Sequence, residues 1–245
     1  MSGSLSRILV LQHHELEHPG TFRDFLAADS IPWDAVRLDA GEAIPSLDGY
    51  GALIAMGGPQ DVWEEDRFPW LVAEKAAIRE AVIARGLPYL GVCLGHQLLA
   101  SALGGEVAAM PGKAEIGLGE VTLTAEGERD ALLGGDGAAL GCLQWHAAEV
   151  TALPTGAVVL AANAASRIQA MRWGERAYGL QFHVEAGAST VEEWAGIPAY
   201  RKALERGLGA GELERFAAAA RERAPDFRLR AERLYRRFMA LLAKR

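Results

Sequence analysis

Residues 88–100, PYLGVCLGHQLLA, constrain the fold of this chain more than any other segment. A short apolar run, typical of a strand buried on both faces of a parallel sheet, leads into GVCLG and then into a helical pattern. The glycines on either side of Cys93 let neighbouring backbone approach where a Cβ atom would clash. The segment therefore predicts a strand, a sharp turn that carries Cys93, and a helix.

Apolar runs and helical patterns alternate from residue 7 onward. We expect strands at 7–12, 35–38, 51–56 and 87–92, and helices at 21–28, 69–85 and 96–103. Strand-like runs with few helices between them then follow at 115–124, 141–145, 157–162, 168–173 and 177–183. This change of pattern predicts an α/β fold with a mixed sheet, parallel at first and with antiparallel strands added later.

The C-terminal part of the chain is helical and basic. An apolar stripe at steps of three and four predicts one long helix: Phe227, Ala231, Leu234, Phe238 and Leu241. Residues 201–245 carry 13 Lys and Arg against 6 Asp and Glu, whereas the rest of the chain carries 12 against 26. We expect 1–190 to form one domain and 191–245 a helical extension packed on its acidic flank. A basic tail that binds a partner is the alternative.

Composition excludes several classes of protein. Half of the residues are hydrophobic, which excludes a mainly disordered chain. A net charge of −7 argues against nucleic acid as a partner, and no apolar run is long enough for a signal peptide or a membrane span. Two cysteines are too few for a disulfide scaffold. We therefore expect a cytoplasmic protein without a membrane partner.

Cys93 is the candidate nucleophile. The pattern G-x-C-x-G between a strand and a helix matches the nucleophile elbow with cysteine in place of serine. The helix that begins there points N–H groups and its positive dipole end at the sulfur, which favours the reactive thiolate. Cys142 lies in the apolar run LGCLQW without such a frame, and we expect it in the core.

A nucleophilic cysteine needs a base that a third group orients. We interpret His13, His14 and His18 as surface residues of a loop, with a metal role only weakly supported because no cysteine or carboxylate pattern completes a zinc spacing. His96 follows Cys93 by three residues on the same helix and is too constrained to reach back over the sulfur. These four histidines are poor candidates for the base.

His183 and Glu185, in the run AYGLQFHVEAG, are the best candidates for the base and its orienting group. On an extended strand, residues two apart face the same side, so the carboxylate could orient the imidazole. His146, at the end of another strand, is a candidate pocket residue. Together with Cys93 these residues predict a Cys-His-Glu triad.

The turn at residues 57–59, GGP, completes the predicted site. It follows a strand, as Cys93 does, and ligands of open parallel sheets bind at the carboxyl ends of strands. The backbone N–H groups of Gly58 and Leu94 could then form an oxyanion hole for a tetrahedral intermediate.

In this order, the motifs resemble the class I glutamine amidotransferases, most closely the stand-alone proteins similar to GMP synthase. The resemblance implies a three-layer α/β/α fold of the flavodoxin-like type, glutamine as substrate and no cofactor or metal. The segments that carry it are MGGPQDVWEED (56–66), GVCLGHQLLA (91–100), EIGLGEVTLT (115–124), LQWHAAEV (143–150) and LQFHVEA (180–186).

The resemblance also implies roles for pocket residues. Gln97 matches the family glutamine that contacts the substrate, and Trp145 and His146 match the segment that meets its α-amino end. Gly57 is also expected to bind the substrate. Two positions depart from the family: Val184 stands where many members have proline, and residues 145–148 lack the small or amide residues of some relatives. The second departure bears on which substrate is bound.

Three functions remain open on the sequence. The first is a glutaminase that supplies ammonia to a separate synthase subunit, since residues 186–245 contain no glycine loop that could cradle a phosphate. The second is a γ-glutamyl peptide or amide hydrolase with the same thioester chemistry. The third is a redox or interaction module without catalysis, which would not need an orienting carboxylate.

Overall fold

The structure, a computed structural model, describes residues 7–112, 114–135 and 137–243 and is built around one large sheet. The strands lie in the order β2-β1-β3-β4-β11-β10-β9-β6-β7. β6 and β10 run against the direction of the others, so the sheet is mixed and mostly parallel, as expected. Its strands are β1 (Arg7–Gln12), β2 (Trp33–Arg37), β3 (Tyr50–Ala55), β4 (Tyr89–Val92), β6 (Glu115–Leu123), β7 (Ala139–His146), β9 (Ala157–Ala162), β10 (Ala170–Trp173) and β11 (Ala177–Leu180).

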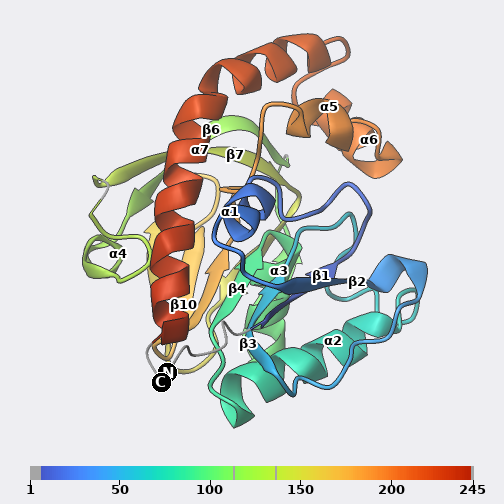
Figure 1. The fold of residues 1–245 in the computed structure, drawn as a ribbon. Helices are drawn as coiled ribbons and strands as arrows, with labels where there is room; N and C mark the ends of the chain where they lie inside the picture. Colours follow the sequence, from blue (N-terminus) through green and yellow to red (C-terminus); the bar gives the residue numbers. More distant parts are fainter. Residues whose placement is uncertain (1–6, 113, 136, 244–245) are drawn as a thin grey trace.

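Helices cover both faces of the sheet, which gives the three-layer α/β/α arrangement (Figure 1). β1 illustrates how the sequence builds the layers, because alternate side chains of a strand point to opposite faces. Ile8 and Val10 enter the core on one face, whereas Leu9 and Leu11 enter the core on the other. One face is covered by α1 (Phe22–Ala28) and α7 (Leu213–Ala243), and the other by α2 (Trp70–Arg79) and α3 (Leu94–Ala102).

Some predicted elements differ from the structure in detail. The helix predicted over 69–85 is found, as an α-helix that ends at Arg79 and a wider π turn, Glu80–Ala84, that continues it. The strand predicted over 177–183 stops at Leu180. Four short elements of the described chain were not predicted, because three to five residues carry too little periodicity. They are a 3₁₀ helix (Leu38–Ala40), β5 (Glu106–Ala109), β8 (Ala148–Ala152), which pairs with β5 in a second small sheet, and α4 (Ala125–Arg129).

The C-terminal helices follow the prediction more closely. The expected apolar stripe of α7 is buried throughout, and Pro225 lies inside the helix. The helix is visibly bent (Figure 1). Arg228 pairs with Asp24 of α1 over 2.6 Å, so basic side chains of α7 do meet acidic ones of the body. The division into 1–190 and 191–245 stays a prediction. The shorter helices are α5 (Thr190–Trp194) and α6 (Pro198–Gly207).

In the described part of the chain, no helix has both the length and the apolar character that crossing a membrane requires.

Candidate active site

Cys93 occupies the sharp turn between β4 and α3. Its φ of 51° and ψ of −104° are rare for a residue with a Cβ atom, and its exposed fraction is 4%. A Cβ atom on Gly91 would lie 2.3 Å from the carbonyl oxygen of Gly95, and one on Gly95 would lie 2.1 Å from that of Ala55. Both glycines are therefore required for this turn to pack against its neighbours.

His183 and Glu185 form a buried pair. The distance from His183 Nδ1 to Glu185 Oε1 is 2.8 Å, and both side chains are almost fully buried. The predicted cause is wrong, because β11 ends at Leu180 and the two residues do not share a regular strand. Instead, the backbone N–H of His183 donates to the carbonyl of Leu143 on β7 over 2.9 Å. After Leu180 the chain thus leaves the neighbours of β11 and bonds to β7, and the side chains of His183 and Glu185 still meet.

The surroundings of His183 favour the imidazolium. Burial alone lowers the pKa of His183, but the Glu185 carboxylate and the Cys93 sulfur together outweigh burial and hold the pKa well above 6.5. Nε2 of His183 makes no hydrogen bond within the described part of the chain. With Nδ1 held by Glu185, Nε2 is the nitrogen that remains for chemistry at Cys93.

The turn at residues 57–59 lies beside Cys93. A Cβ atom on Gly58 would lie 2.9 Å from Leu94 Cδ2, so the two predicted oxyanion donors are neighbours. Gly58, Cys93 and Leu94 line the same pocket. The N–H groups of Gly58 and Leu94 donate to no acceptor among the described residues. The pocket of Cys93 is therefore lined by two residues whose N–H groups are uncommitted among the described residues.

The pocket wall contains some predicted residues and not others. Gly57, His183 and Glu185 do not line it. Tyr200 and Arg206 of α6 contribute to the wall, although their sequence gave no sign of it, because the docking of α6 is a long-range contact. The predicted residues on the wall are Gly58, Cys93, Leu94, Gln97, Trp145 and His146.

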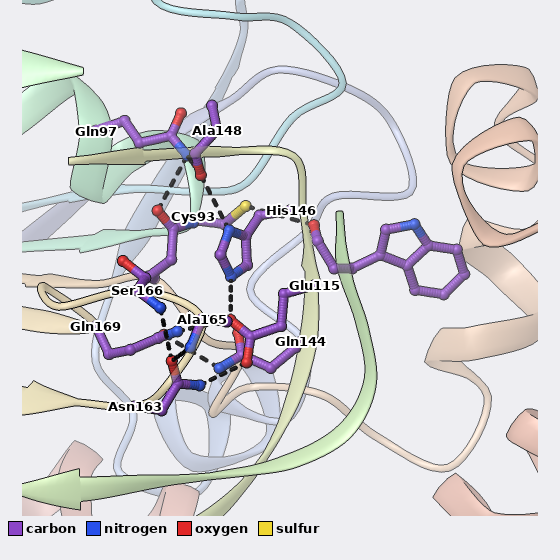
Figure 2. A network of polar contacts seen from close by, with 12 residues as sticks. Cys93, Gln97, Glu115, Gln144, His146, Ala148, Asn163, Ala165, Ser166 and Gln169 are labelled. Atoms are coloured by element: carbon purple, nitrogen blue, oxygen red, sulfur yellow. Dashed lines mark hydrogen bonds and ion pairs between the residues drawn. The ribbon is translucent and has the colours of Figure 1, made fainter. Parts of the chain in front are cut away.

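A network of polar contacts holds two of the predicted substrate-binding residues, Gln97 and His146 (Figure 2). Gln97 Nε2 donates to the carbonyl of Ala148 over 3.1 Å, and His146 Nδ1 lies 2.9 Å from the same oxygen. His146 Nε2 lies 3.0 Å from Glu115 Oε2. Both nitrogens of His146 are therefore engaged within the protein. Glu115 also accepts hydrogen bonds from the side chains of Asn163 and Gln169.

His13 is the main correction among the histidines. It is fully buried rather than a surface residue, with Nε2 beside the Glu74 carboxylate and Nδ1 2.9 Å from the carbonyl of Gly57. Two signals could have revealed the pair. His13 follows the carboxyl end of a central strand, and Glu74 interrupts the apolar stripe formed by Leu71 and Ile78.

The remaining three histidines, His14, His18 and His96, do not belong to a buried ion pair of this kind among the described residues. His14 and His18 are half-buried in the loop, and His96 is fully buried. Burial, with repulsion from His146, lowers the pKa of His96 to about 3, so it is uncharged. Across residues 7–112, 114–135 and 137–243, no three His, Cys, Asp or Glu side chains gather as metal ligands would.

Glu17 is a buried acid beside the site that no pattern in the sequence had indicated. Its carboxylate is fully buried, and neither oxygen has a hydrogen-bond partner among the described residues. A Cβ atom on Gly57 would lie 2.6 Å from Glu17 Oε2 and 3.2 Å from His183 Cε1, which places the carboxyl close to the imidazole. Burial raises the pKa of Glu17 to about 7, and the charge of His183 and the nearby Tyr200 hydroxyl only partly oppose it.

Glu17→Gln should therefore stabilise the fold at neutral pH. In the unfolded chain Glu17 ionises at its ordinary pKa of 4.5, whereas in the folded chain it stays protonated up to about pH 7. The free energy of unfolding of the variant should equal that of the wild type below pH 4.5. Between pH 4.5 and 7 the variant should become the more stable of the two, and the difference should level off at about 3 kcal/mol. Urea unfolding at a series of pH values measures this, with Glu15→Gln as the exposed control. A difference that does not change with pH would contradict the assignment.

Comparison with known proteins identifies the family of this chain. The sequence model of the family described as "Glutamine amidotransferase class-I" matches residues 26–193. The glutamine amidotransferase-like protein YfeJ of Salmonella typhimurium is 35% identical over 76% of this chain and 78% of its own. A subunit of the glutamine-hydrolysing GMP synthase of Sulfurisphaera tokodaii is 33% identical over 62% of this chain and 76% of its own.

The fold is also found among solved structures. The crystal structure of a glutamine amidotransferase from Thermotoga maritima superposes with a TM-score of 0.86 at 27% identity, covering 96% of this chain and 99% of that one. The matched segment of the family extends from α1 to α5 and includes Cys93, His183 and Glu185. The chain belongs to the class I glutamine amidotransferase family.

Proposed function

We propose that the chain hydrolyses the side-chain amide of glutamine to glutamate and ammonia through a thioester on Cys93. The observation that carries the proposal is the meeting of three features at one place. These are a cysteine on a strained turn, a buried His183–Glu185 pair whose imidazole interacts with that cysteine, and the N–H groups of Gly58 and Leu94, two residues that line the pocket of Cys93. Acyl transfer by a cysteine requires a nucleophile, an oriented base and an oxyanion site.

In the first half of the reaction, the Cys93 thiolate attacks the carboxamide carbon. The carbonyl oxygen becomes an oxyanion that accepts hydrogen bonds from the N–H groups of Gly58 and Leu94. The His183 imidazolium gives its Nε2 proton to the amide nitrogen, the C–N bond breaks, and ammonia leaves. A γ-glutamyl thioester remains on the sulfur. The raised pKa of His183 supports this role, because the imidazole must carry a proton at neutral pH.

In the second half, the neutral imidazole removes a proton from a water molecule, which attacks the thioester carbon. The same N–H groups stabilise the second oxyanion. The C–S bond then breaks, which releases glutamate and restores the Cys93 thiolate and the His183 imidazolium. Glu185 keeps the imidazole in the orientation and tautomer that both steps need.

Gln97, Trp145 and His146 are proposed to hold the amino-acid end of the substrate. Their support is their place on the pocket wall and, for Gln97 and His146, hydrogen bonds that fix the side chains. Gly57 is proposed to act through the peptide it shares with Gly58. We further infer that the ammonia is passed to a separate synthase subunit. The name of the Sulfurisphaera tokodaii relative supports this, because it describes one subunit of a glutamine-hydrolysing synthase.

A substrate comparison tests the proposal. The purified full chain is incubated separately with glutamine, glutathione and a γ-glutamyl amine, and glutamate and ammonia are quantified. We expect equal amounts of glutamate and ammonia from glutamine, and much slower release of glutamate from the other two. Turnover of the γ-glutamyl peptide with none of glutamine would establish the γ-glutamyl hydrolase instead. Release of glutamate from none of the three would favour a module without catalysis.

A further inference from the structure

A buried ion pair lies under the turn that carries Gly58. His13 follows β1 and Glu74 belongs to α2, and both side chains are fully buried. His13 Nε2 lies 3.0 and 2.9 Å from the two carboxylate oxygens of Glu74. Burial of two charges costs about as much free energy as their attraction returns. A contribution to stability therefore does not explain why such a pair is present. Its position next to the pocket suggests a different role.

The second nitrogen of His13 connects this pair to the turn. His13 Nδ1 lies 2.9 Å from the carbonyl oxygen of Gly57, which belongs to the peptide group that also contains the Gly58 N–H. The carbonyl and the N–H of a trans peptide point in opposite directions, and the described chain contains no cis peptide. With the carbonyl held by His13, the Gly58 N–H must point away from His13.

The peptide between Gly57 and Gly58 needs such an anchor. A Cβ atom on Gly58 would lie 2.6 Å from His13 Cβ, so glycine is required there, and one on Gly57 would lie 2.6 Å from Glu17 Oε2 and displace the end of that side chain. A peptide between two glycines is also the kind that rotates most easily, because no side chain restricts its dihedral angles. The glycines that allow the turn therefore do not fix the orientation of the peptide between them, which depends on contacts with other residues.

His13 is suited to hold that peptide. Both of its ring nitrogens face acceptors, and only the imidazolium can donate from both. Burial lowers the pKa of His13, but the Glu74 carboxylate outweighs burial and raises it above the ordinary value. A charged donor binds a carbonyl more strongly than a neutral one and polarises the amide. Stacking on Trp70, at 5.3 Å between ring centroids, and a hydrogen bond from Gln60 to the backbone of His13 fix its position.

We propose that the His13–Glu74 ion pair positions the Gly57–Gly58 peptide so that the Gly58 N–H faces the oxyanion formed at Cys93. The inference rests on the proposed function, because it needs a tetrahedral intermediate at Cys93. His13 and Glu74 are positioning residues, since neither touches the substrate. Their loss should therefore affect the bond-making step and leave ground-state binding unchanged.

The test replaces both charges together, because removing one would leave the other buried and unpaired. In His13→Leu/Glu74→Leu, we expect kcat for glutamate release to fall about 10²-fold, as for a lost oxyanion donor, with KM within about twofold. Alkylation of Cys93 by iodoacetamide, a displacement that forms no oxyanion, should keep its wild-type rate. The matched control is Lys75→Met/Glu65→Gln, which removes another ion pair of α2 and should retain kcat.

The outcomes separate this inference from the proposed function. A wild-type chain that releases no glutamate contradicts the proposed function itself. A wild-type chain that turns over through Cys93, with an unchanged kcat in the double variant, overturns only the role of His13 and Glu74. Equal losses in kcat and in iodoacetamide reactivity would indicate a general structural role and also overturn it. If the double variant does not fold, Glu74→Gln keeps the size and the hydrogen bond but removes the charge, and should lower kcat without changing KM.

Discussion

Replacement of Cys93 by alanine should lower glutamate release from glutamine by at least about 10⁴-fold, because the thioester cannot form without the sulfur. The oxyanion N–H groups and the pocket would remain, so substrate should still bind. Alanine and cysteine carry the same Cβ atom, and the strain at a φ of 51° is therefore common to both. Steady-state glutamate release and a thermal melt by circular dichroism measure the two effects.

Cys142→Ala is the matched control for this experiment. Cys142 is buried in the core together with apolar residues of α7, and burial raises the pKa of its thiol well above the ordinary value, so it is inert. The control should lose some stability and keep its kcat. Glutamate release that survives in Cys93→Ala, or disappears in Cys142→Ala with an intact fold, would contradict the assignment of the nucleophile.

Glu185→Gln should cause the second large loss, about 10³- to 10⁴-fold in kcat. The amide has the size of the carboxylate, but it can present an N–H to His183 Nδ1 and so favour the wrong tautomer. It also removes the charge that raises the pKa of His183, so the imidazolium is less populated at neutral pH. The measurement is kcat between about pH 6 and 9, where the imidazolium of the variant should be lost at lower pH than that of the wild type.

Glu126→Gln is the control for Glu185→Gln. Glu126 is an exposed carboxylate of α4 that pairs only with the exposed Arg129 among the described residues, and its loss should leave kcat unchanged. A loss below about tenfold in Glu185→Gln would show that the carboxylate does not orient the imidazole. Equal losses in the two variants would point to an effect of net charge.

The nucleophile turn could be predicted because its signal is local. The strand, the glycines, the cysteine and the helix follow one another directly in the sequence. The close backbone contacts that the glycines predicted are present, including that between Gly95 and Ala55. The expected core position of Cys142 is also confirmed. The signal was again local, because an apolar run such as LGCLQW predicts burial without knowledge of the neighbouring strands. Local patterns of this kind predict both the backbone conformation of a segment and whether its side chains are buried.

The buried charges near the site could not be predicted in the same way. Whether His13 is exposed depends on α2 covering it, and Glu74 lies 61 residues away along the chain. Glu17 lies in the same loop as His13, and its neighbour Tyr200 comes from α6. The geometry at His183 has the same origin, because its backbone bonds to β7 rather than continuing a strand. These features depend on long-range packing. The local signals at His13 and Glu74 mark each residue separately, but which partner each one meets depends on how the elements pack.

The central claim is a covalent γ-glutamyl intermediate on Cys93, and its direct capture is the sharpest test. The full chain is mixed with excess glutamine and quenched in acid during turnover, and the intact protein and its peptides are weighed by mass spectrometry. We predict a mass increase of one γ-glutamyl group on the peptide that contains Cys93, present in Cys142→Ala and absent in Cys93→Ala. Steady release of glutamate with no adduct on Cys93, or with an adduct on another residue, would contradict the claim.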